Sequence, residues 1–219
     1  TTLTALLFDD IDSLFWVGSE NGLASSPNAL PGFWTIDTVN LDQTTFDHNI
    51  RATSGDEDGL SGNFAVPVEV QYYDGDRYVW VAGNSTGLTG ETNGINLSTD
   101  NGRTWDVVLT GINAWNFAFD GAVVYAATSA GLLRTSDFGE SWDTLQLVDA
   151  GTGSEIYEGT EFFGVGLAED VIWAASNDGM AKSTDGGNSW SVYRTFEDVP
   201  EDAGASAYAS PVPSSPFVS

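Results

Sequence analysis

Short apolar runs that end in small residues recur along the chain. Each run is followed by a turn that contains Gly, and the runs cover residues 14–18, 78–82, 123–127 and 171–175. Runs of this length, rich in β-branched and aromatic residues and bounded by Gly, Asn and Asp, are typical of β-strands. A further apolar segment precedes each run, at residues 4–8, 64–70, 115–119 and 162–167. No segment shows the 3.6-residue periodicity of a helix, so we expect an all-β protein.

Polar residues follow a second and more specific pattern. The octapeptide Ser-Thr-Asp-Asn-Gly-Arg-Thr-Trp at residues 98–105 returns in altered form at 135–142 and 183–190. All copies fit the frame (Ser/Thr)-x-Asp-x-Gly-x-(Ser/Thr)-Trp. The frame positions are held by Ser98, Asp100, Gly102, Thr104 and Trp105, by Thr135, Asp137, Gly139, Ser141 and Trp142, and by Ser183, Asp185, Gly187, Ser189 and Trp190. The copies begin 37 and then 48 residues apart, which is typical of stacked repeats built from one supersecondary unit.

The residue types of this frame predict a hairpin corner. An Asp side chain accepts hydrogen bonds from backbone amides a few residues further on, and Gly adopts a positive φ without strain. The hydroxyl residues close further local hydrogen bonds, and the Trp begins the next strand as a large apolar anchor. We therefore expect these aspartates to stabilise turns and not to bind a metal or act in catalysis.

The frame resembles the Asp-box (BNR) repeat of sialidases and sortilin-like receptors. The resemblance implies a β-propeller in which each box joins the third and fourth strands of a blade, away from the ligand face. We expect four four-stranded blades that form part of a larger ring, at about residues 1–37, 64–110, 114–147 and 162–194. The first unit lacks a clean box, and residues 25–34 stand in its place.

The C-terminal residues 197–219 differ in composition from the rest of the chain. An acidic stretch is followed by a Pro- and Ser-rich stretch, which is typical of a linker. The segment 207–217 resembles the opening of C-terminal sorting domains of some Gram-negative bacteria. That resemblance implies a longer polypeptide at the cell surface or outside the cell.

Charge and composition narrow the choice of partners. The chain has 32 Asp and Glu residues against 6 Lys and Arg, for a net charge of −26. Nucleic acid and anionic membrane surfaces would be repelled. The excess of acidic residues resembles proteins of marine or saline habitats. The absence of Cys excludes disulfides and thiolate metal sites, and no apolar run is long enough to insert into a membrane.

Long connections are the candidate binding elements. Strand direction alternates within a blade, so the connections between blades and the second-to-third strand turns share one face, opposite the boxes. The long ones are expected at residues 35–63, 83–94 and 148–161, and each is equally compatible with a solvated variable insertion. The candidate binding residues are His48, Arg51, Glu155, Tyr157 and Glu158. The acidic cluster Asp56, Glu57 and Asp58 offers oxygen ligands to Ca²⁺ without the spacing of a known loop motif, and no other cofactor is suggested.

Two functions from different classes remain open. Sialidase-like catalysis needs three arginines to hold a carboxylate, whereas this chain has five in all, of which Arg103 lies inside a box and Arg134 directly precedes one. The favoured hypothesis is a non-catalytic extracellular β-propeller that acts as a binding or structural scaffold. Its expected partners are other protein chains or further blades, with a glycan as another candidate ligand. The alternative is a glycan-active hydrolase whose site is completed by blades outside this segment.

Overall fold

Four antiparallel sheets of four strands each form the framework of the described part of the chain. The computed structural model describes residues 2–11, 13–20, 22–26, 50–52, 59–156 and 160–195, with only the backbone described at 50–52. In every four-stranded sheet the strands pair in the order in which they occur along the sequence. The prediction of an all-β protein built from four-stranded units is confirmed.

We number the sheets as blades 1 to 4. Blade 1 contains β1 (Leu3–Asp9), β2 (Leu14–Ser19), β3 (Gly22–Ser26) and β4 (Ile50–Ala52). Blade 2 contains β5 (Phe64–Tyr73), β6 (Asp76–Asn84), β7 (Gly94–Ser98) and β8 (Asp106–Thr110). Blade 3 contains β9 (Ala114–Asp120), β10 (Val123–Thr128), β11 (Gly131–Thr135) and β12 (Asp143–Thr144). Blade 4 contains β15 (Phe162–Ala168), β16 (Val171–Ser176), β17 (Gly179–Ser183) and β18 (Ser191–Tyr193). A hairpin of β13 (Leu147–Val148) and β14 (Glu155–Ile156) lies between blades 3 and 4 in the sequence.

The structure changes the expected boundary of blade 1. We had expected this blade to end near residue 37, but its fourth strand is Ile50–Ala52, which pairs with β3. Arg51, expected in a connecting loop, is therefore part of a strand opposite Ala24. The expectation failed because this strand has three residues, too few to carry a recognisable hydrophobic pattern, and its place depends on pairing with β3.

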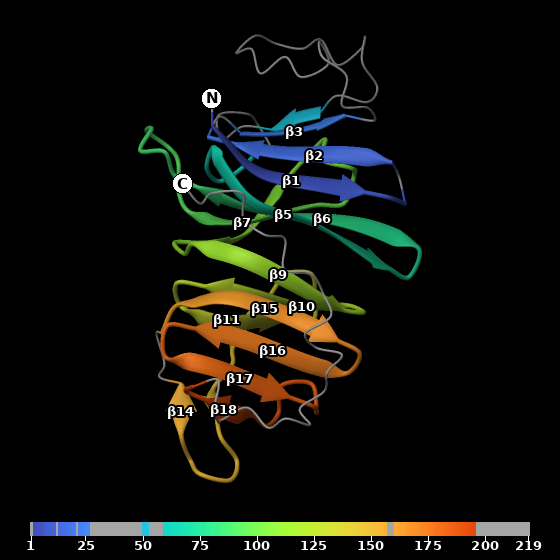
Figure 1. Ribbon diagram of the computed structural model, residues 1–219. Helices are drawn as coiled ribbons and strands as arrows, with labels where there is room; N and C mark the ends of the chain where they lie inside the picture. The colour runs from blue at the N-terminus through green and yellow to red at the C-terminus, as the bar shows by residue number, and fades with distance from the viewer. Residues whose placement is uncertain are drawn as a thin grey trace, which may run out of the picture.

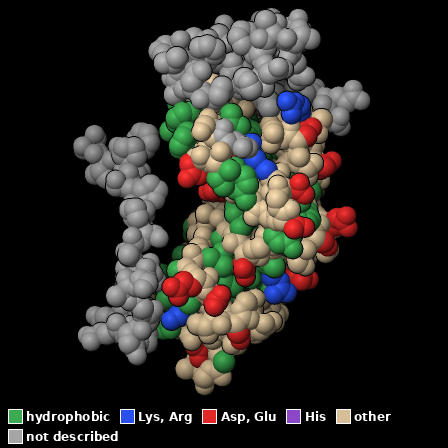
Figure 2. All heavy atoms as spheres, turned by 90° about the vertical axis from the view of Figure 1, so that its right-hand side faces the viewer, with side chains coloured by type: hydrophobic (Ala, Val, Ile, Leu, Met, Phe, Trp, Pro, Cys, Tyr) green, Lys and Arg blue, Asp and Glu red, His purple; other side chains and the backbone are tan. Residues whose placement is uncertain are grey.

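The blades are arranged one after another in sequence order, from blade 1 at the top of Figure 1 to blade 4 at the bottom. Their first strands β1, β5, β9 and β15 are neighbours in space, each in contact with the next. The turns between first and second strands lie on the right of Figure 1, where β1 and β15 end. Figure 2 looks onto this side, and acidic side chains are spread over its described surface.

An apolar core fills each junction between consecutive blades. The core between blades 1 and 2 is built around Trp16, Val68 and Val81. Trp80, Phe117 and Val124 belong to the next core, and Tyr125, Val165 and Ile172 to the last. Each blade therefore buries both faces of its sheet when it has a neighbour on each side, because side chains alternate between the faces along a strand.

One aromatic residue of the second strand is central to each junction. Trp16, Trp80 and Tyr125 occupy equivalent positions on β2, β6 and β10, and each is at most 2 % exposed. Each contacts the turn between the third and fourth strands of the following blade. Trp16 packs on Gly102, the Trp80 ring lies 6.2 Å edge-on from that of Trp142, and the Tyr125 hydroxyl donates to the Gly186 carbonyl at 3.4 Å.

Candidate functional site

The three motif segments 98–105, 135–142 and 183–190 form turns between the third and fourth strands of blades 2, 3 and 4. We call them the box turns. In the first, the Asp100 carboxylate accepts hydrogen bonds from the amides of Arg103 and Thr104 at 3.0 and 2.9 Å. It also accepts from the hydroxyls of Ser98 and Thr104 at 2.9 and 2.8 Å. Both oxygens of this carboxylate thus accept hydrogen bonds from within the turn.

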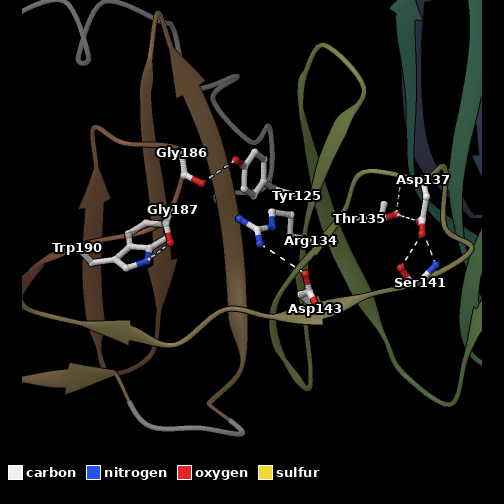
Figure 3. A network of polar contacts seen from close by, with 9 residues as sticks. All are labelled: Tyr125, Arg134, Thr135, Asp137, Ser141, Asp143, Gly186, Gly187 and Trp190. Carbon is white, nitrogen blue, oxygen red and sulfur yellow. Dashed lines mark hydrogen bonds and ion pairs between the residues drawn. The ribbon is translucent and has the colours of Figure 1, made fainter.

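The other two box turns repeat this geometry. Asp137 accepts from the Thr135 hydroxyl at 2.7 Å and from both the amide and the hydroxyl of Ser141 (Figure 3). Asp185 accepts from the Ser183 hydroxyl at 2.8 Å and from the Ser189 amide at 2.9 Å. The spacing of the motif brings each Asp within reach of these donors, since all of them lie two to four residues away.

These hydrogen bonds keep the box carboxylates ionised. Hydrogen bonds from Ser141 and Thr135 lower the pKa of Asp137 to about 2, and those from Ser189 and Ser183 lower the pKa of Asp185 to about 2. Burial acts to raise the pKa of Asp100, but its hydrogen bonds together outweigh burial, so the pKa still falls below its ordinary value. Such groups are poor general acids or bases at neutral pH, because their pKa lies far from it.

The box tryptophans are anchored in two ways. Trp105 and Trp190 each donate their indole N–H to the carbonyl of the glycine three residues earlier, Gly102 and Gly187, at 3.1 Å. Trp142 instead donates to the Val108 carbonyl of blade 2 at 3.3 Å. The indole N–H of the box therefore stabilises its own turn in two blades and joins two blades in the other case.

On the face opposite the box turns, the connection between β6 and β7 is organised by Glu91. One carboxylate oxygen accepts from the Thr86 amide at 2.6 Å and its hydroxyl at 2.8 Å. The other accepts from the Asn63 side-chain amide at 2.6 Å. A single carboxylate thus fixes the conformation of this loop and ties it to the segment that enters blade 2. The sequence motifs did not indicate Glu91, since its donors are not at a recognisable spacing.

Another long connection on this face contains the β13–β14 hairpin, which covers the outer edge of β18. The Ala150 amide donates to the Trp190 carbonyl at 3.1 Å, and the Val192 amide donates to the Asp149 carboxylate at 3.0 Å. Arg194 donates to the Glu155 carbonyl at 2.6 Å. These contacts pair backbone groups at the outer edge of β18. An uncovered sheet edge can pair with a strand of another chain and cause aggregation. The Val192 and Thr152 amides lower the pKa of Asp149 to about 2.

The expected binding residues lie mostly outside the part of the chain that the structure describes. His48, the acidic residues Asp56, Glu57 and Asp58, and Tyr157 and Glu158 lie outside the described residues. Glu155 lies in β14, where its carbonyl holds Arg194. Within the described ranges, no group of three or more His, Asp or Glu side chains is arranged to hold a metal ion.

The arginines whose side chains are described all take part in contacts within the protein. Arg77 and Asp9 form a buried ion pair at 3.0 Å that joins blade 2 to blade 1, with side chains 8 % and 1 % exposed. Arg103 donates to the Asp100 carbonyl within a box turn, and Arg134 lies 3.5 Å from Asp143 (Figure 3). Arg194, directly after β18, donates to the hairpin. The described arginine side chains therefore hold separate places in the fold, and no three of them share one of these contacts.

Glu69 is a further titratable residue that the motifs did not indicate. It lies on the first strand of blade 2, where it pairs with Trp80 across the sheet. Desolvation by burial raises its pKa to about 7. Its one signal in the sequence is a charged residue inside the apolar run 64–70. A carboxylic acid with such a pKa is suited to proton transfer at neutral pH.

Comparison with known proteins identifies the fold. The chain is similar to the CNH domain of AfRom2, with a TM-score of 0.57 and 11% identity over 91% of this chain and 58% of that one. It is also similar to an ancestral GH74 enzyme, with a TM-score of 0.55 and 16% identity over 86% of this chain and 24% of that one. For the GH74 xyloglucanase from Xanthomonas campestris the TM-score is 0.51, with 18% identity over 85% and 29% of the two chains. These proteins are β-propellers. The chain has the fold of a β-propeller.

The chain is shorter than these similar proteins and matches only part of each of them. The chain spans a little over half of the CNH chain and less than a third of each GH74 chain. No protein-family model and no curated protein matches the sequence. Among the described residues, no helix is long and apolar enough to cross a membrane. At identities of this size the similarity establishes the fold and leaves the function to the site itself.

Proposed function

We propose that this propeller is a non-catalytic extracellular module that acts as a binding or structural scaffold. The observation that carries the proposal is that the box aspartates and the described arginine side chains are engaged in structural contacts. The box aspartates hold turns. The described arginine side chains contact a box turn, the adjacent strand of their own blade, the β13–β14 hairpin or a neighbouring blade. A site of this kind offers rigid surfaces and few groups for bond making.

The face opposite the box turns is the proposed binding surface. Its two long connections are held in fixed conformations by Glu91 and Asp149 over their described residues, so binding would require little ordering of these segments. Other protein chains are the favoured partners, and the net charge of −26 favours cationic or metal-bridged ones. A glycan is another candidate ligand. Ca²⁺ bound by Asp56, Glu57 and Asp58 is a candidate ion to bridge the two acidic partners.

The box turns support membership of the Asp-box repeat family as part of this proposal. Each motif copy forms the same Asp-centred turn at the same place in a blade. The acidic composition and the resemblance of residues 207–217 to sorting domains support a cell-surface or extracellular location, in a Gram-negative bacterium of a saline habitat.

The proposal is tested by measuring binding and hydrolysis with the same protein. The purified chain is incubated with xyloglucan and other polysaccharides, and we expect no release of reducing ends under conditions where a GH74 xyloglucanase releases them. Binding to immobilised surface proteins of the source cells is measured in parallel by surface plasmon resonance. Glu91→Ala should weaken that binding at least tenfold by releasing the β6–β7 loop. Glu140→Ala, an exposed residue of a box turn, is the matched control and should leave it unchanged. Equal effects of the two substitutions would contradict the assignment of the binding face.

Glu69 gives specific support to a second candidate, a glycan-active hydrolase. Inverting and retaining glycosidases both use a carboxylic acid with a raised pKa to protonate the leaving group, together with a second carboxylate. In this alternative the second carboxylate comes from a blade outside the described residues. Polysaccharide hydrolysis that is abolished by Glu69→Gln, with the fold intact by circular dichroism, would favour the hydrolase over the scaffold.

A further inference from the structure

The side of blade 4 that faces away from blade 3 has the composition of a blade junction. We call it the forward face of blade 4. It is formed by residues that alternate with the buried ones on β15, β16 and β17, namely Gly166, Trp173, Ala175, Met180 and Lys182. All of them are at least partly exposed, whereas the alternate residues Val165, Ile172 and Ala174 are buried against blade 3.

This face repeats the forward face of blade 3 position by position. On blade 3, Tyr125 pairs with Arg134, and Ala127 pairs with Leu132. On blade 4, Trp173 pairs with Lys182, and Ala175 pairs with Met180. Both faces therefore present an aromatic residue opposite a cation, and a small residue opposite a large aliphatic one.

Blade 4 itself covers the forward face of blade 3. Tyr125 is 2 % exposed, and Ala127 and Leu132 are fully buried in the core between these blades. Their counterparts Trp173, Ala175 and Met180 keep partial exposure. A Cβ added at Gly164 or Gly166, on the first strand of blade 4, would meet no atom within 4 Å. The same kind of surface is thus filled in one blade and open in the next.

The occupied junctions show what such a face binds. At each of them the second-strand aromatic contacts the box turn of the following blade, through Gly102, Trp142 or Gly186. Trp173 is the fourth member of this aromatic series. Its ring carries the Lys182 ammonium 5.5 Å from the centroid, and its indole nitrogen is buried without a hydrogen-bond partner among the described residues.

We propose that the forward face of blade 4 binds a further four-stranded blade that carries a box turn, and that Trp173 packs on that turn. This inference rests on the proposed scaffold function and names its partner on this surface. Blade 1 of a second copy is the less suitable occupant. It exposes Leu6 and Phe8, 72 % and 51 % exposed, but its third-to-fourth strand connection, residues 27–49, contains no copy of the motif.

The test extends the protein by the blade that already fills this kind of face. Residues 1–219 are followed by a second copy of residues 160–195, with residues 196–219 as the linker. Thermal unfolding is measured for the original and the extended chain, each with and without Trp173→Ala in blade 4. We expect the fall in Tm caused by Trp173→Ala to be at least twice as large in the extended chain. Leu88→Ala, an exposed residue of the β6–β7 loop, is the control and should shift Tm equally in both chains.

Two independent measurements keep the proposal falsifiable if the extended chain unfolds in a complex way. Limited chymotrypsin digestion should spare the appended blade, and Trp173→Arg in blade 4 should make it sensitive. Light scattering of the original chain should give a monomer. A dimer that Trp173→Arg splits would assign the face to a second copy and overturn the proposal, as would an appended blade that is digested whether or not Trp173 is present. Neither result would affect the binding measured at the face opposite the box turns, which tests the scaffold function.

Discussion

Gly102 allows a positive φ in the box turn and leaves room for the Trp16 ring, and Gly102→Ala should disturb both. Gly102 has a φ of +83°, and a Cβ built on it would lie 2.8 Å from Cη2 and 3.0 Å from Cζ3 of Trp16. A non-glycine residue in this backbone region costs about 1–2 kcal/mol. Overpacking a filled site against an aromatic ring costs about 1–3 kcal/mol more. The substitution should therefore lower the free energy of unfolding by about 2–5 kcal/mol.

Gly75 provides the matched control, because it shares the backbone conformation without the contact. Its φ is +86°, and an added Cβ would meet nothing within 4 Å. Gly75→Ala should cost about 1–2 kcal/mol, the strain alone. Urea denaturation followed by tryptophan fluorescence measures both, and the difference between them reports the packing of Trp16 on the box turn of the next blade.

A third variant tests whether Trp16 is the cause. In a Trp16→Leu background the shorter side chain leaves room for the new methyl group, so Gly102→Ala should cost no more than Gly75→Ala does in the native chain. Equal costs for the two glycine substitutions in the native chain would refute the packing of Trp16 on the box turn. A cost at Gly102 that persists unchanged in the Trp16→Leu background would refute it as well.

Three further outcomes follow from the ionisable groups. The pKa of Glu69 is raised from 4.5 to about 7, so the folded state binds more protons than the unfolded state between these pH values. The free energy of unfolding should therefore fall by on the order of 2 kcal/mol as pH rises from about 4.5 to 7. Urea titrations measure this fall, and Glu69→Gln should abolish it. Asp137 has the opposite effect: its lowered pKa of about 2 stabilises the fold above about pH 4, and this contribution is lost as pH falls towards 2. Asp137→Asn should therefore reduce the fall in Tm that is measured as pH decreases from about 4 to 2. Arg77→Met should destabilise the fold by about 3–5 kcal/mol, because it removes the cation paired with the buried Asp9 carboxylate. Arg134→Met breaks an exposed pair and should cost about 0–1 kcal/mol in the same denaturation assay.

Local patterns in the sequence were sufficient for the repeating elements. The strand expected at residues 4–8 extends over Leu3–Asp9, and the one expected at 171–175 extends over Val171–Ser176. Alternation along a strand and the two-residue turn at Asp74 and Gly75, both with positive φ, depend on neighbours in the sequence. The box turns are equally local, since each Asp meets donors within four residues.

The candidate site was less accessible to sequence reasoning. Glu91 gathers donors from Asn63 and Thr86, and no spacing rule links these residues. Glu69 has a raised pKa because it is buried in the folded protein, and composition does not report burial. His48, Tyr157 and the calcium candidates remain predictions, because they lie outside the described residues.

The four-stranded β units and their Asp-centred turns can be predicted from short stretches of sequence, because they depend on hydrogen bonds and side-chain alternation within a few residues. Three other features depend on contacts between distant residues: the strand that completes blade 1, the aromatic that packs on each box turn, and the burial of Arg77 against Asp9. These outcomes depend on surfaces brought together from distant parts of the chain, where the gain from burying apolar area and pairing charge has no local signature. The proposed role of the forward face of blade 4 also depends on tertiary structure, since it follows from comparison with the forward face of blade 3, which blade 4 covers.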